Sequence, residues 1–294
     1  MQVKKKSSVS PFKVVMCALL IVYAVTLFLP MLWGLMTTFK AQAEFRKNVL
    51  GLPQDWTIEN YTTALTHLYL DVRRGVSLVR VPFTRMFLYS VLYAGGCALA
   101  TTVTTCVMSY ASARFPQYKL SKVIYYIVVV CMILPVVGSL PSEINMSQMF
   151  GLYNKIWGLW IMKISFLGMY FLVFYATFRS LPDDYAEAAR IDGAGELRIM
   201  VQIFFPLARY TFMTILLLYF IQYWNDYQVP LIYLPAYPTV AYGVFSFGNS
   251  GDAALANVPV KITACIITVV PILILFLIFH KRLIGNVSMG GLKE

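Results

Sequence analysis

The chain has 294 residues, of which 59% are hydrophobic and only 13% are charged. Soluble domains usually carry about 25% charged residues, so this composition excludes an ordinary soluble protein and predicts an integral membrane protein. The formal net charge of +11 requires no nucleic acid partner, because Lys and Arg are normally enriched on the inner side of membrane proteins.

Six long apolar stretches predict six membrane-spanning helices. A spanning helix needs about 17–25 mostly apolar residues, and each stretch is close to this length. In chain order we expect helices at about 13–37, 86–112, 121–140, 156–178, 210–229 and 260–280. The chain, 1–294, is therefore predicted to be a single all-α membrane domain. Close helix packing is expected in the second helix, at Gly95, Gly96, Ala98 and Ala100.

The first apolar stretch has flanks like those of a signal peptide. Lys4-Lys5-Lys6 precedes it, and Ala41-Gln42-Ala43 follows it as a candidate cleavage site. The apolar part of a signal peptide is only about 7–15 residues long, whereas this stretch runs uncharged over 14–39. We therefore expect a retained membrane helix.

The segment of about 40–85 is predicted to lie outside the membrane. A turn is expected at 51–53, where glycine and proline occur together, and a short helix is expected to begin within 57–61. The second half of the segment carries several arginines against Asp71. Two interpretations remain open: these cations are solvated or near lipid headgroups, or they meet an acidic protein or an acidic solute. The arginines are Arg73, Arg74, Arg80 and Arg85.

Lys163 is the one charged residue within the predicted fourth helix. It lies about 10 Å along a helix that begins at Ile156. Its side chain either extends to the outer interface, or it lines a pathway and meets an anionic group. Both interpretations remain open.

Residues 179–208 form a polar segment between the predicted fourth and fifth helices, and they predict a helix–turn–helix. Ser180 is a candidate cap, and the acids that follow it suit the start of a helix. Gly193 is placed to end this helix in a left-handed conformation, and a second helix is expected at about 195–204, before Pro206. One face is predicted to carry Asp183, Glu187 and Arg190, and the other Tyr185, Ala188 and Ala189.

The composition of these faces bears on what the polar segment binds. An amphipathic helix that lies on lipid normally has a basic polar face and bulky apolar residues. Here the polar face has mixed charge, and the face with Ala188 and Ala189 is low enough for another protein to approach closely. Composition therefore favours protein docking over lipid binding.

The predicted fifth helix ends in residues that suit either sugar binding or a membrane interface. Aromatic rings beside amide and carboxyl groups suit sugar rings and hydroxyls, but Trp and Tyr also gather at membrane interfaces. The candidate pathway residues are Tyr223, Trp224, Asn225 and Asp226, together with Lys163.

The distribution of Lys and Arg predicts that both termini lie in the cytoplasm. The loop at 114–122 carries three of these residues and is placed inside, whereas the loop at 230–258 carries none and is placed outside. With this orientation the polar segment at 179–208 lies on the cytoplasmic side.

The polar segment resembles a known signature. Glu187-Ala188-Ala189, Gly193, Ile203 and Pro206 match the pattern E-A-A-x3-G-x9-I-x-L-P of the cytoplasmic loop in bacterial ABC importer permeases, with Phe205 in place of leucine. Further stretches are similar to permeases of the maltose and oligosaccharide type. Nearly the whole chain resembles them, apart from Tyr89 early in the second helix and a segment of about 67–82 that looks inserted. The further stretches are 52–61, 110–115, 224–232 and 290–293.

The resemblance implies the permease subunit of an ATP-driven oligosaccharide importer in a bacterial inner membrane. Its implied partners are a second homologous permease, an ABC ATPase dimer, an extracellular solute-binding protein and membrane lipid. ATP and magnesium would be bound by the ATPase, because this chain lacks the phosphate loop G-x-x-x-x-G-K-[ST]. The implied coupling residues are Glu187, Ala188, Ala189, Asp192, Gly193, Ile203 and Pro206, and the candidate binding-protein contacts are Arg73, Arg74, Gly248 and Asn249.

Other functions are weaker alternatives. An importer of this kind for another solute fits the same signature. An ion-coupled transporter would need acids within its membrane helices, and the predicted first, second, third and sixth helices contain none. Neither an enzyme nor a metal site is expected, because the five cysteines lie in apolar stretches without metal-ligand spacing, and His67 and His280 are far apart.

Overall fold

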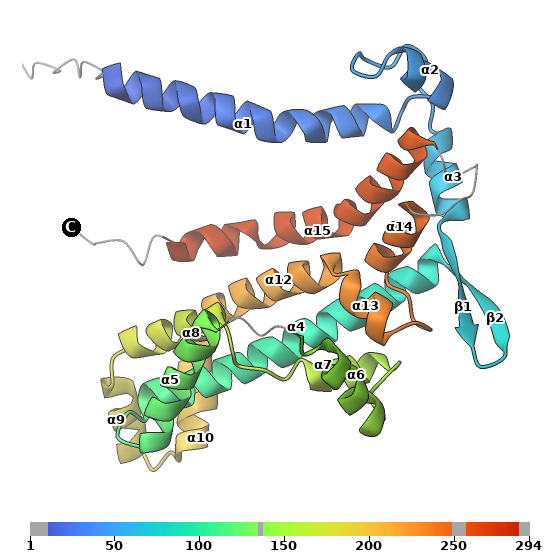
Figure 1. The fold of residues 1–294 in the computed structure, drawn as a ribbon. Helices are drawn as coiled ribbons and strands as arrows, with labels where there is room; N and C mark the ends of the chain where they lie inside the picture. Colours follow the sequence, from blue (N-terminus) through green and yellow to red (C-terminus); the bar gives the residue numbers. More distant parts are fainter. Residues whose placement is uncertain (1–10, 135–137, 249–256, 288–294) are drawn as a thin grey trace, which may run out of the picture. The chain divides into compact units, whose positions relative to one another are not determined.

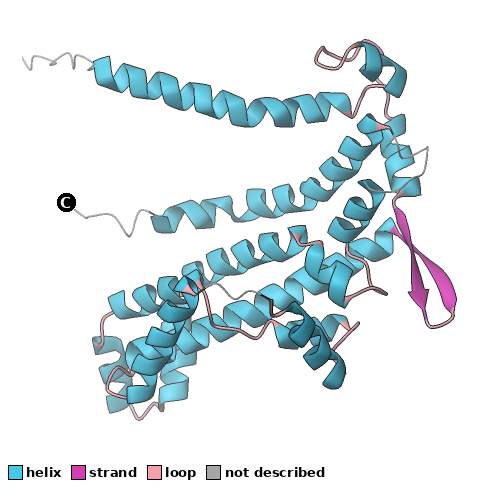
Figure 2. Cartoon of the chain, in the orientation of Figure 1, coloured by secondary structure: helices cyan, strands magenta, loops and turns pink. Residues whose placement is uncertain are grey.

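The computed structural model describes residues 11–134, 138–248 and 257–287, with side chains up to Ile278 in the last range. This part of the chain is predominantly helical and contains one two-stranded sheet (Figure 2). The expected helical membrane fold is therefore confirmed. Residue contacts define two compact units, Met1–Leu68 with Phe247–Val269, and Tyr69–Ser246 with Val270–Glu294. The single domain expected over 1–294 stays a prediction.

The first unit contains a compact turn region after its first helix. The chain bends at 49–51, just before the turn expected at 51–53, and there Asn48 Oδ1 accepts a hydrogen bond from the Gly51 N–H at 2.8 Å. Lys40 is fully buried beside it, and its ammonium donates to the carbonyls of Asn48, Val49 and Gly51. A buried charge needs such compensation. The helices of this unit are α1 (Pro11–Thr37), α2 (Gln42–Lys47), α3 (Glu59–His67) and the first part of α15 (Val258–Val287).

The second unit is built around α4 (Phe83–Arg114). This helix contacts α7 (Ile156–Met162), α8 (Met169–Ser180) and α12 (Arg209–Asn225) (Figure 1). The buried side chains of α4 include Tyr93, Ala94 and Ala98, and those of α8 include Phe174 and Phe178. Lipid is as apolar as these side chains, so close packing rather than exclusion of water holds such helices together.

Gly96 shows why small residues on α4 permit close packing. A Cβ atom at Gly96 would lie 2.1 Å from Nε1 of Trp160 in α7. Trp160 uses this space to donate a hydrogen bond to the Leu92 carbonyl, at 3.0 Å. The neighbouring Gly95 has no such atom within 4 Å. The contact between α4 and α7 therefore depends on only one of the two glycines.

The continuous helix expected at 156–178 is wrong, because the chain breaks there. α7 ends at Met162 and α8 begins at Met169. Lys163 is the C-cap of α7, and Gly168 precedes α8 with a φ of 137°. Residues 163–168 therefore have carbonyls and N–H groups outside any helical ladder, and these groups need partners within the protein.

Hydroxyl groups on α4 donate hydrogen bonds to some of the backbone carbonyls at the break between α7 and α8. Thr101 Oγ1 donates to the Lys163 carbonyl at 2.9 Å, and Thr105 Oγ1 donates to the Ser165 carbonyl at 3.3 Å. Ser109 Oγ reaches the Phe171 carbonyl in the first turn of α8, at 3.0 Å. Because residues four apart lie on one face of a helix, the three hydroxyls form a single stripe along α4.

The described helices differ in length from several expected spans. Three are long and apolar enough to cross a membrane, namely α1, α4 and α15, and a fourth results if Glu196–Leu207 and Arg209–Asn225, bent by 75°, count as one. The helix expected at 121–140 is shorter, since α5 is Lys119–Ile133. The helix expected at 210–229 ends at Asn225 and is followed by α13 (Gln228–Tyr233). Two further short helices are α6 (Leu140–Met149) and α14 (Val240–Gly248). The count of six spans stays a prediction.

A β-hairpin occupies the segment that looked inserted. β1 (Tyr69–Arg74) pairs antiparallel with β2 (Ser77–Pro82), and Arg74 lies opposite Ser77. Arg74 fixes the hairpin to its unit: Nη2 donates to the Tyr89 hydroxyl and to the Ala236 carbonyl, both at 3.0 Å. The guanidinium also lies 4.9 Å from the ring centre of Tyr237. The turn is open to solvent, with Val76 97% exposed.

We predict that Gly96→Ala destabilises the protein by about 1–3 kcal/mol, the usual effect of overpacking. The added methyl would displace Trp160 and break its hydrogen bond to Leu92. The measurement is the midpoint of thermal unfolding in detergent. Gly95→Ala is the matched control and should leave that midpoint unchanged or raise it, because alanine favours a helix. Equal midpoints for the two variants would contradict the packing described.

We predict that Arg74→Ala loosens the hairpin without unfolding the rest of its unit. A hydrogen bond from a charged group contributes about 1.5–3 kcal/mol, so amide hydrogen exchange in 69–82 should accelerate about tenfold or more. Mass spectrometry of the exchanged protein measures this. Arg73→Ala, at the exposed neighbouring position, is the control. Similar exchange in both variants would show that Arg74 is not the anchor.

Candidate functional site

The polar segment folds into the expected helix–turn–helix. Its first helix is α9 (Asp184–Ile191) and its second begins as α10 (Glu196–Ile199). Gly193 has a φ of 81°, so the expected left-handed conformation is confirmed. The Gly193 N–H donates to the Arg190 carbonyl at 3.0 Å, and the Ala194 N–H donates to the Ala189 carbonyl at 2.9 Å. This pair of bonds is a Schellman motif, which satisfies carbonyls at the end of α9.

The start of α9 differs from the expectation. Ser180 is not its cap, because it is the last residue of α8 and its hydroxyl donates to the Thr177 carbonyl at 2.8 Å. Asp183 occupies the N-cap position, but its side chain makes no cap hydrogen bond. Its carboxylate instead contacts Arg114. The Asp183 side chain is therefore engaged with α4 instead of capping its own helix.

The second helix of the segment widens before Pro206. A π-helix, η1 (Met200–Phe204), separates α10 from α11 (Phe205–Leu207). Proline lacks an N–H and crowds the carbonyl four residues before it, and a π-turn relieves this conflict. The chain then bends by 75° into α12. Pro206 thus marks the exit from the polar segment.

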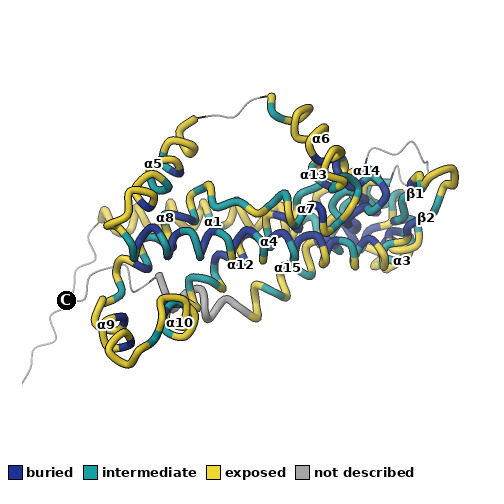
Figure 3. Tube along the Cα trace, turned by 90° about the horizontal axis from the view of Figure 1, so that it is seen from below, coloured by how far each residue is buried: buried dark blue, intermediate teal, exposed yellow. Residues whose placement is uncertain are grey.

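The faces of α9 are not those that the sequence suggested. Ala186 and Ala189 are buried, whereas Tyr185, Glu187 and Ala188 are exposed (Figure 3). The expected grouping of Tyr185, Ala188 and Ala189 on one face is therefore wrong. Residues three apart share a face of a helix, so the pair at 186 and 189 packs onto the unit itself and turns Glu187 outward.

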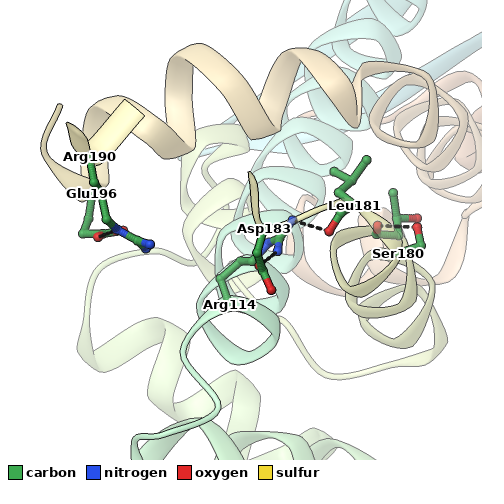
Figure 4. Close-up of polar contacts among 7 residues, drawn as sticks. Arg114, Ser180, Leu181, Asp183, Arg190 and Glu196 are labelled. Carbon is green, nitrogen blue, oxygen red and sulfur yellow. Dashed lines mark hydrogen bonds and ion pairs between the residues drawn. The ribbon is translucent and has the colours of Figure 1, made fainter. Parts of the chain in front are cut away.

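Two ion pairs hold the segment. Arg114, at the end of α4, contacts Asp183 and also donates from Nη2 to the Leu181 carbonyl at 2.9 Å (Figure 4). Arg190 pairs with Glu196 across the turn, at 2.8 Å from Nε to Oε1. This hydrogen bond raises the pKa of Arg190, as expected for a cation stabilised by a neighbouring carboxylate.

The outer surface of the segment is acidic and apolar. Ile191 is 87% exposed and Leu197 is 73% exposed, and they flank the turn at Gly193. Among the described residues, the Glu187 carboxylate has no ion pair or side-chain hydrogen bond. The segment therefore presents an exposed acid without an ion pair beside exposed apolar side chains, an arrangement suited to contact with another macromolecule.

The candidate pathway residues of α12 fall on different faces. Tyr223 and Trp224 are 7% and 2% exposed, and they pack within their own unit. Asn225 is exposed, as is Gln222 three residues before it. Asp226 accepts a hydrogen bond from the Tyr93 hydroxyl at 3.1 Å and another from the Val229 N–H at 3.1 Å, so both of its oxygens are engaged within the unit.

Lys163 lies at the break between α7 and α8. Its backbone carbonyl accepts from Thr101, and its ammonium lies 5.8 Å from the ring centre of Tyr223. The side chain is half-buried. No carboxylate among the described residues is within ion-pair distance of it. The structure therefore places a cation next to the aromatic face of α12.

The candidate contacts on the outer segments have distinct environments. Arg74 anchors the hairpin, whereas Arg73 is exposed. Gly248 is exposed, and its carbonyl accepts a hydrogen bond from Lys261 Nζ at 2.9 Å. Asn249 lies outside the described residues, as does the tail at 290–293. Arg73 is thus the more accessible of the two arginines.

Some structurally important residues were not predicted from the sequence. The hydroxyls of Thr101, Thr105 and Ser109 carried a readable signal in their spacing of four. The contact between Arg114 and Asp183 carried none, because 69 residues separate the two. Among the described residues, no His, Cys, Asp and Glu side chains gather as a metal site would require.

Comparison with known proteins identifies the family. Residues 106–288 match the family described as "Binding-protein-dependent transport system inner membrane component". A diacetylchitobiose uptake system permease of Streptomyces coelicolor is 31% identical, covering 97% of this chain and 90% of the relative. A melibiose/raffinose/stachyose import permease of Bacillus subtilis is 26% identical, covering 90% of this chain and 91% of the relative.

A solved structure shares the fold. It is a chain of a bacterial ABC transporter involved in the import of the acidic polysaccharide alginate, with a TM-score of 0.75 and 21% identity. The match covers 96% of this chain and 99% of that chain. The resemblance first drawn from Glu187 to Pro206 is confirmed by these matches. The two relatives named above are permeases of sugar uptake systems, and the chain belongs to the inner membrane components of binding-protein-dependent transport systems.

Proposed function

We propose that this chain is one of two permease subunits of an ATP-driven importer, and that the importer takes up oligosaccharides delivered by an extracellular binding protein. The family and the names of the relatives support this proposal. The observation that carries the coupling to ATP is the outward-facing Glu187, which is exposed and forms no ion pair with any described residue. The sequence lacks a phosphate loop, so an ABC ATPase dimer supplies ATP hydrolysis and binds ATP and magnesium.

The polar segment at 179–208 is the part that docks to this ATPase. Glu187 forms an ionic contact there, and Ala188 leaves room for the partner because its side chain is small and exposed. Ala189 instead seats α9 on its own unit. Gly193 sets the turn that exposes Asp192, and Pro206, with the half-buried Ile203, fixes the exit toward α12.

Charge favours a protein rather than lipid as the partner of this segment. Between 183 and 196 the sequence has five acids and a single arginine. Membrane-surface helices usually have a basic polar face, because inner leaflets are anionic. A positively charged cleft of an ATPase subunit fits the acidic face of α9 better than a lipid surface does.

The attachments at the two ends of α4 support a proposal about which side of the membrane the hairpin and the polar segment lie on. The hairpin adjoins its first residue, and the polar segment contacts its last (Figure 1). A helix of 32 residues is about 48 Å long, which exceeds the roughly 30 Å hydrocarbon core. With the polar segment in the cytoplasm, the hairpin lies outside, where the exposed Arg73 meets the binding protein. The cytoplasmic termini and the binding-protein contacts of Gly248 and Asn249 are part of the proposal on the sequence alone.

Outward-facing amides on α12 favour a polar solute. Gln222 and Asn225 are exposed on one face of a membrane helix, and polar side chains are costly in lipid. They therefore line the pathway between the two permease subunits, where sugar hydroxyls replace water. The buried Tyr223 and Trp224 support this face from behind, and Asp226 fixes the junction with α13.

Lys163 favours a second candidate solute, an anionic one. Its half-buried ammonium has no carboxylate partner among the described residues, so an acidic group of a solute would be attracted to it. Relatives named for sulfoquinovosyl glycerol and for sn-glycerol-3-phosphate are 28% and 25% identical. Uptake of a neutral and an acidic sugar by the same complex distinguishes the two candidates.

We predict that Glu187→Lys lowers uptake at least about tenfold, because reversing one member of a docked charge pair costs several kcal/mol. The measurement is ATP-dependent uptake of labelled diacetylchitobiose, raffinose and stachyose into proteoliposomes that contain both permeases, the ATPase and the binding protein. Co-purification of the ATPase should fall in parallel. Glu59→Lys, at an exposed acid of α3, is the control. Normal uptake and co-purification in Glu187→Lys would reject the coupling, and uptake abolished by an ionophore would favour an ion-coupled transporter.

We predict that Asn225→Leu raises the KM for the imported sugar about 5- to 20-fold, the effect of losing one or two hydrogen bonds. Gln222→Leu should act in the same direction. Initial uptake rates over a range of sugar concentrations give the KM. Gln228→Leu removes an exposed amide from α13 and serves as the control. An unchanged KM in both α12 variants would place the pathway elsewhere.

A further inference from the structure

Arg114 joins the last turn of α4 to the polar segment through three contacts. Its Nη2 donates to the Leu181 carbonyl at 2.9 Å, and its Nη1 contacts the carboxylate of Asp183 (Figure 4). The guanidinium also lies 4.0 Å from the ring centre of Phe204. One side chain therefore reaches the linker after α8, the N-cap of α9 and the π-helix η1.

Arg114 lies in a mostly buried and well-packed environment. Its side chain is only 9% exposed, whereas that of Asp183 is 77% exposed. Tyr110, one turn earlier on α4, supports the same region: its ring centre lies 5.3 Å from that of Phe178, 5.5 Å from that of Phe204 and 6.3 Å from that of Phe205. Aromatic pairs at such distances stabilise a contact beyond simple burial. The entrance and the exit of the polar segment are thus both seated on the end of α4.

The other ion pairs among the described residues do not connect the polar segment to a membrane helix. Arg190–Glu196 lies wholly within the polar segment, and Arg80–Asp71 lies within the hairpin. Of the three described ion pairs, Arg114–Asp183 alone joins the segment to a membrane helix. A displacement of α9 therefore has a direct charged link to α4 in addition to the apolar contacts of Ala186 and Ala189.

We infer that Arg114 is a positioning residue that makes α9 and α4 move together when the ATPase displaces the polar segment. This inference rests on the proposed coupling function. Motion of α4 then reaches the hydroxyls of Thr101 and Thr105, which hold the break at 163–168. The link thus runs from the docked helix to the region of Lys163 and Tyr223.

The chemistry of arginine explains why this position needs it. The planar guanidinium donates in two directions at once and also presents a face to a ring. Lysine has a compact charge and cannot hold the Leu181 carbonyl, the Asp183 carboxylate and the Phe204 ring in the same way. Glutamine is planar but uncharged, so it retains at most the contact to the carbonyl. Lysine therefore weakens the link between α4 and α9 less than glutamine does, because lysine keeps the positive charge.

The test uses the full complex in lipid nanodiscs and proteoliposomes, with Arg114→Lys and Arg114→Gln as variants. Two quantities are measured: amide hydrogen exchange in 184–191, and the sugar imported per ATP hydrolysed. We expect Arg114→Gln to accelerate exchange about tenfold and to lower the import per ATP about tenfold, within the usual range of coupling between sites. Arg114→Lys should be intermediate. Lys119→Gln, at an exposed cation of α5 outside the docking segment, should change the import per ATP less than twofold.

A second variant keeps the test decisive if Arg114→Gln does not fold. Asp183→Asn removes the same ion pair from its exposed side, and it should shift both quantities in the same direction by a smaller factor. Normal exchange and normal import per ATP in these variants, while Glu187→Lys impairs uptake, would overturn the inference. A parallel fall of import and hydrolysis in folded Asp183→Asn protein, with the import per ATP unchanged, would also overturn it, because the contact would then be only structural. If Glu187→Lys has no effect, the proposed coupling function fails instead.

Discussion

The structure depends on one constraint, that backbone polar groups within a membrane must find partners inside the protein. The break at 163–168 would be untenable against lipid, and the hydroxyls of Thr101 and Thr105 on α4 satisfy two of its carbonyls, while Ser109 bonds the first turn of α8 that follows it. These residues also fix the distance between α4 and α8, because a hydroxyl reaches only about 3 Å. The position of Lys163 follows from this contact, since its carbonyl is one of the acceptors.

The same constraint separates structural polar groups from those left for a partner. Tyr93 satisfies Asp226, and three carbonyls satisfy the buried Lys40, so these groups need nothing from outside the chain. Glu187 and Asn225 are exposed instead, one on the polar segment and one on a membrane helix. The Asn225 amide donates to the Ile221 carbonyl at 2.9 Å, which leaves its exposed oxygen as the acceptor available to a partner or a solute.

The sequence predicts features that depend on local chemistry better than those that depend on tertiary contacts. Gly193 could be placed because a left-handed residue at a helix end favours glycine. The break at 163–168 was missed because apolar periodicity does not report hydroxyls that lie 60 residues away in the sequence. The hairpin was missed although Val72, Val79 and Val81 alternate with polar residues. The buried face of α9 could not be chosen, because alanines stand at 186, 188 and 189 and only packing distinguishes them.

The continuity of α4 explains why both ends of this helix carry attachments. Its 32 residues include no proline, whereas α1 contains Pro30 and α15 contains Pro271, and α12 enters through a 75° bend. A proline removes a hydrogen bond and lets a helix kink. Because α4 has no such kink, a displacement at one of its ends moves the other end with less bending in between. Arg114 attaches the polar segment to one end of α4, and Arg74 anchors the hairpin beside the other end. If the proposed contacts of the ATPase and the binding protein are correct, both partners act on this one continuous helix.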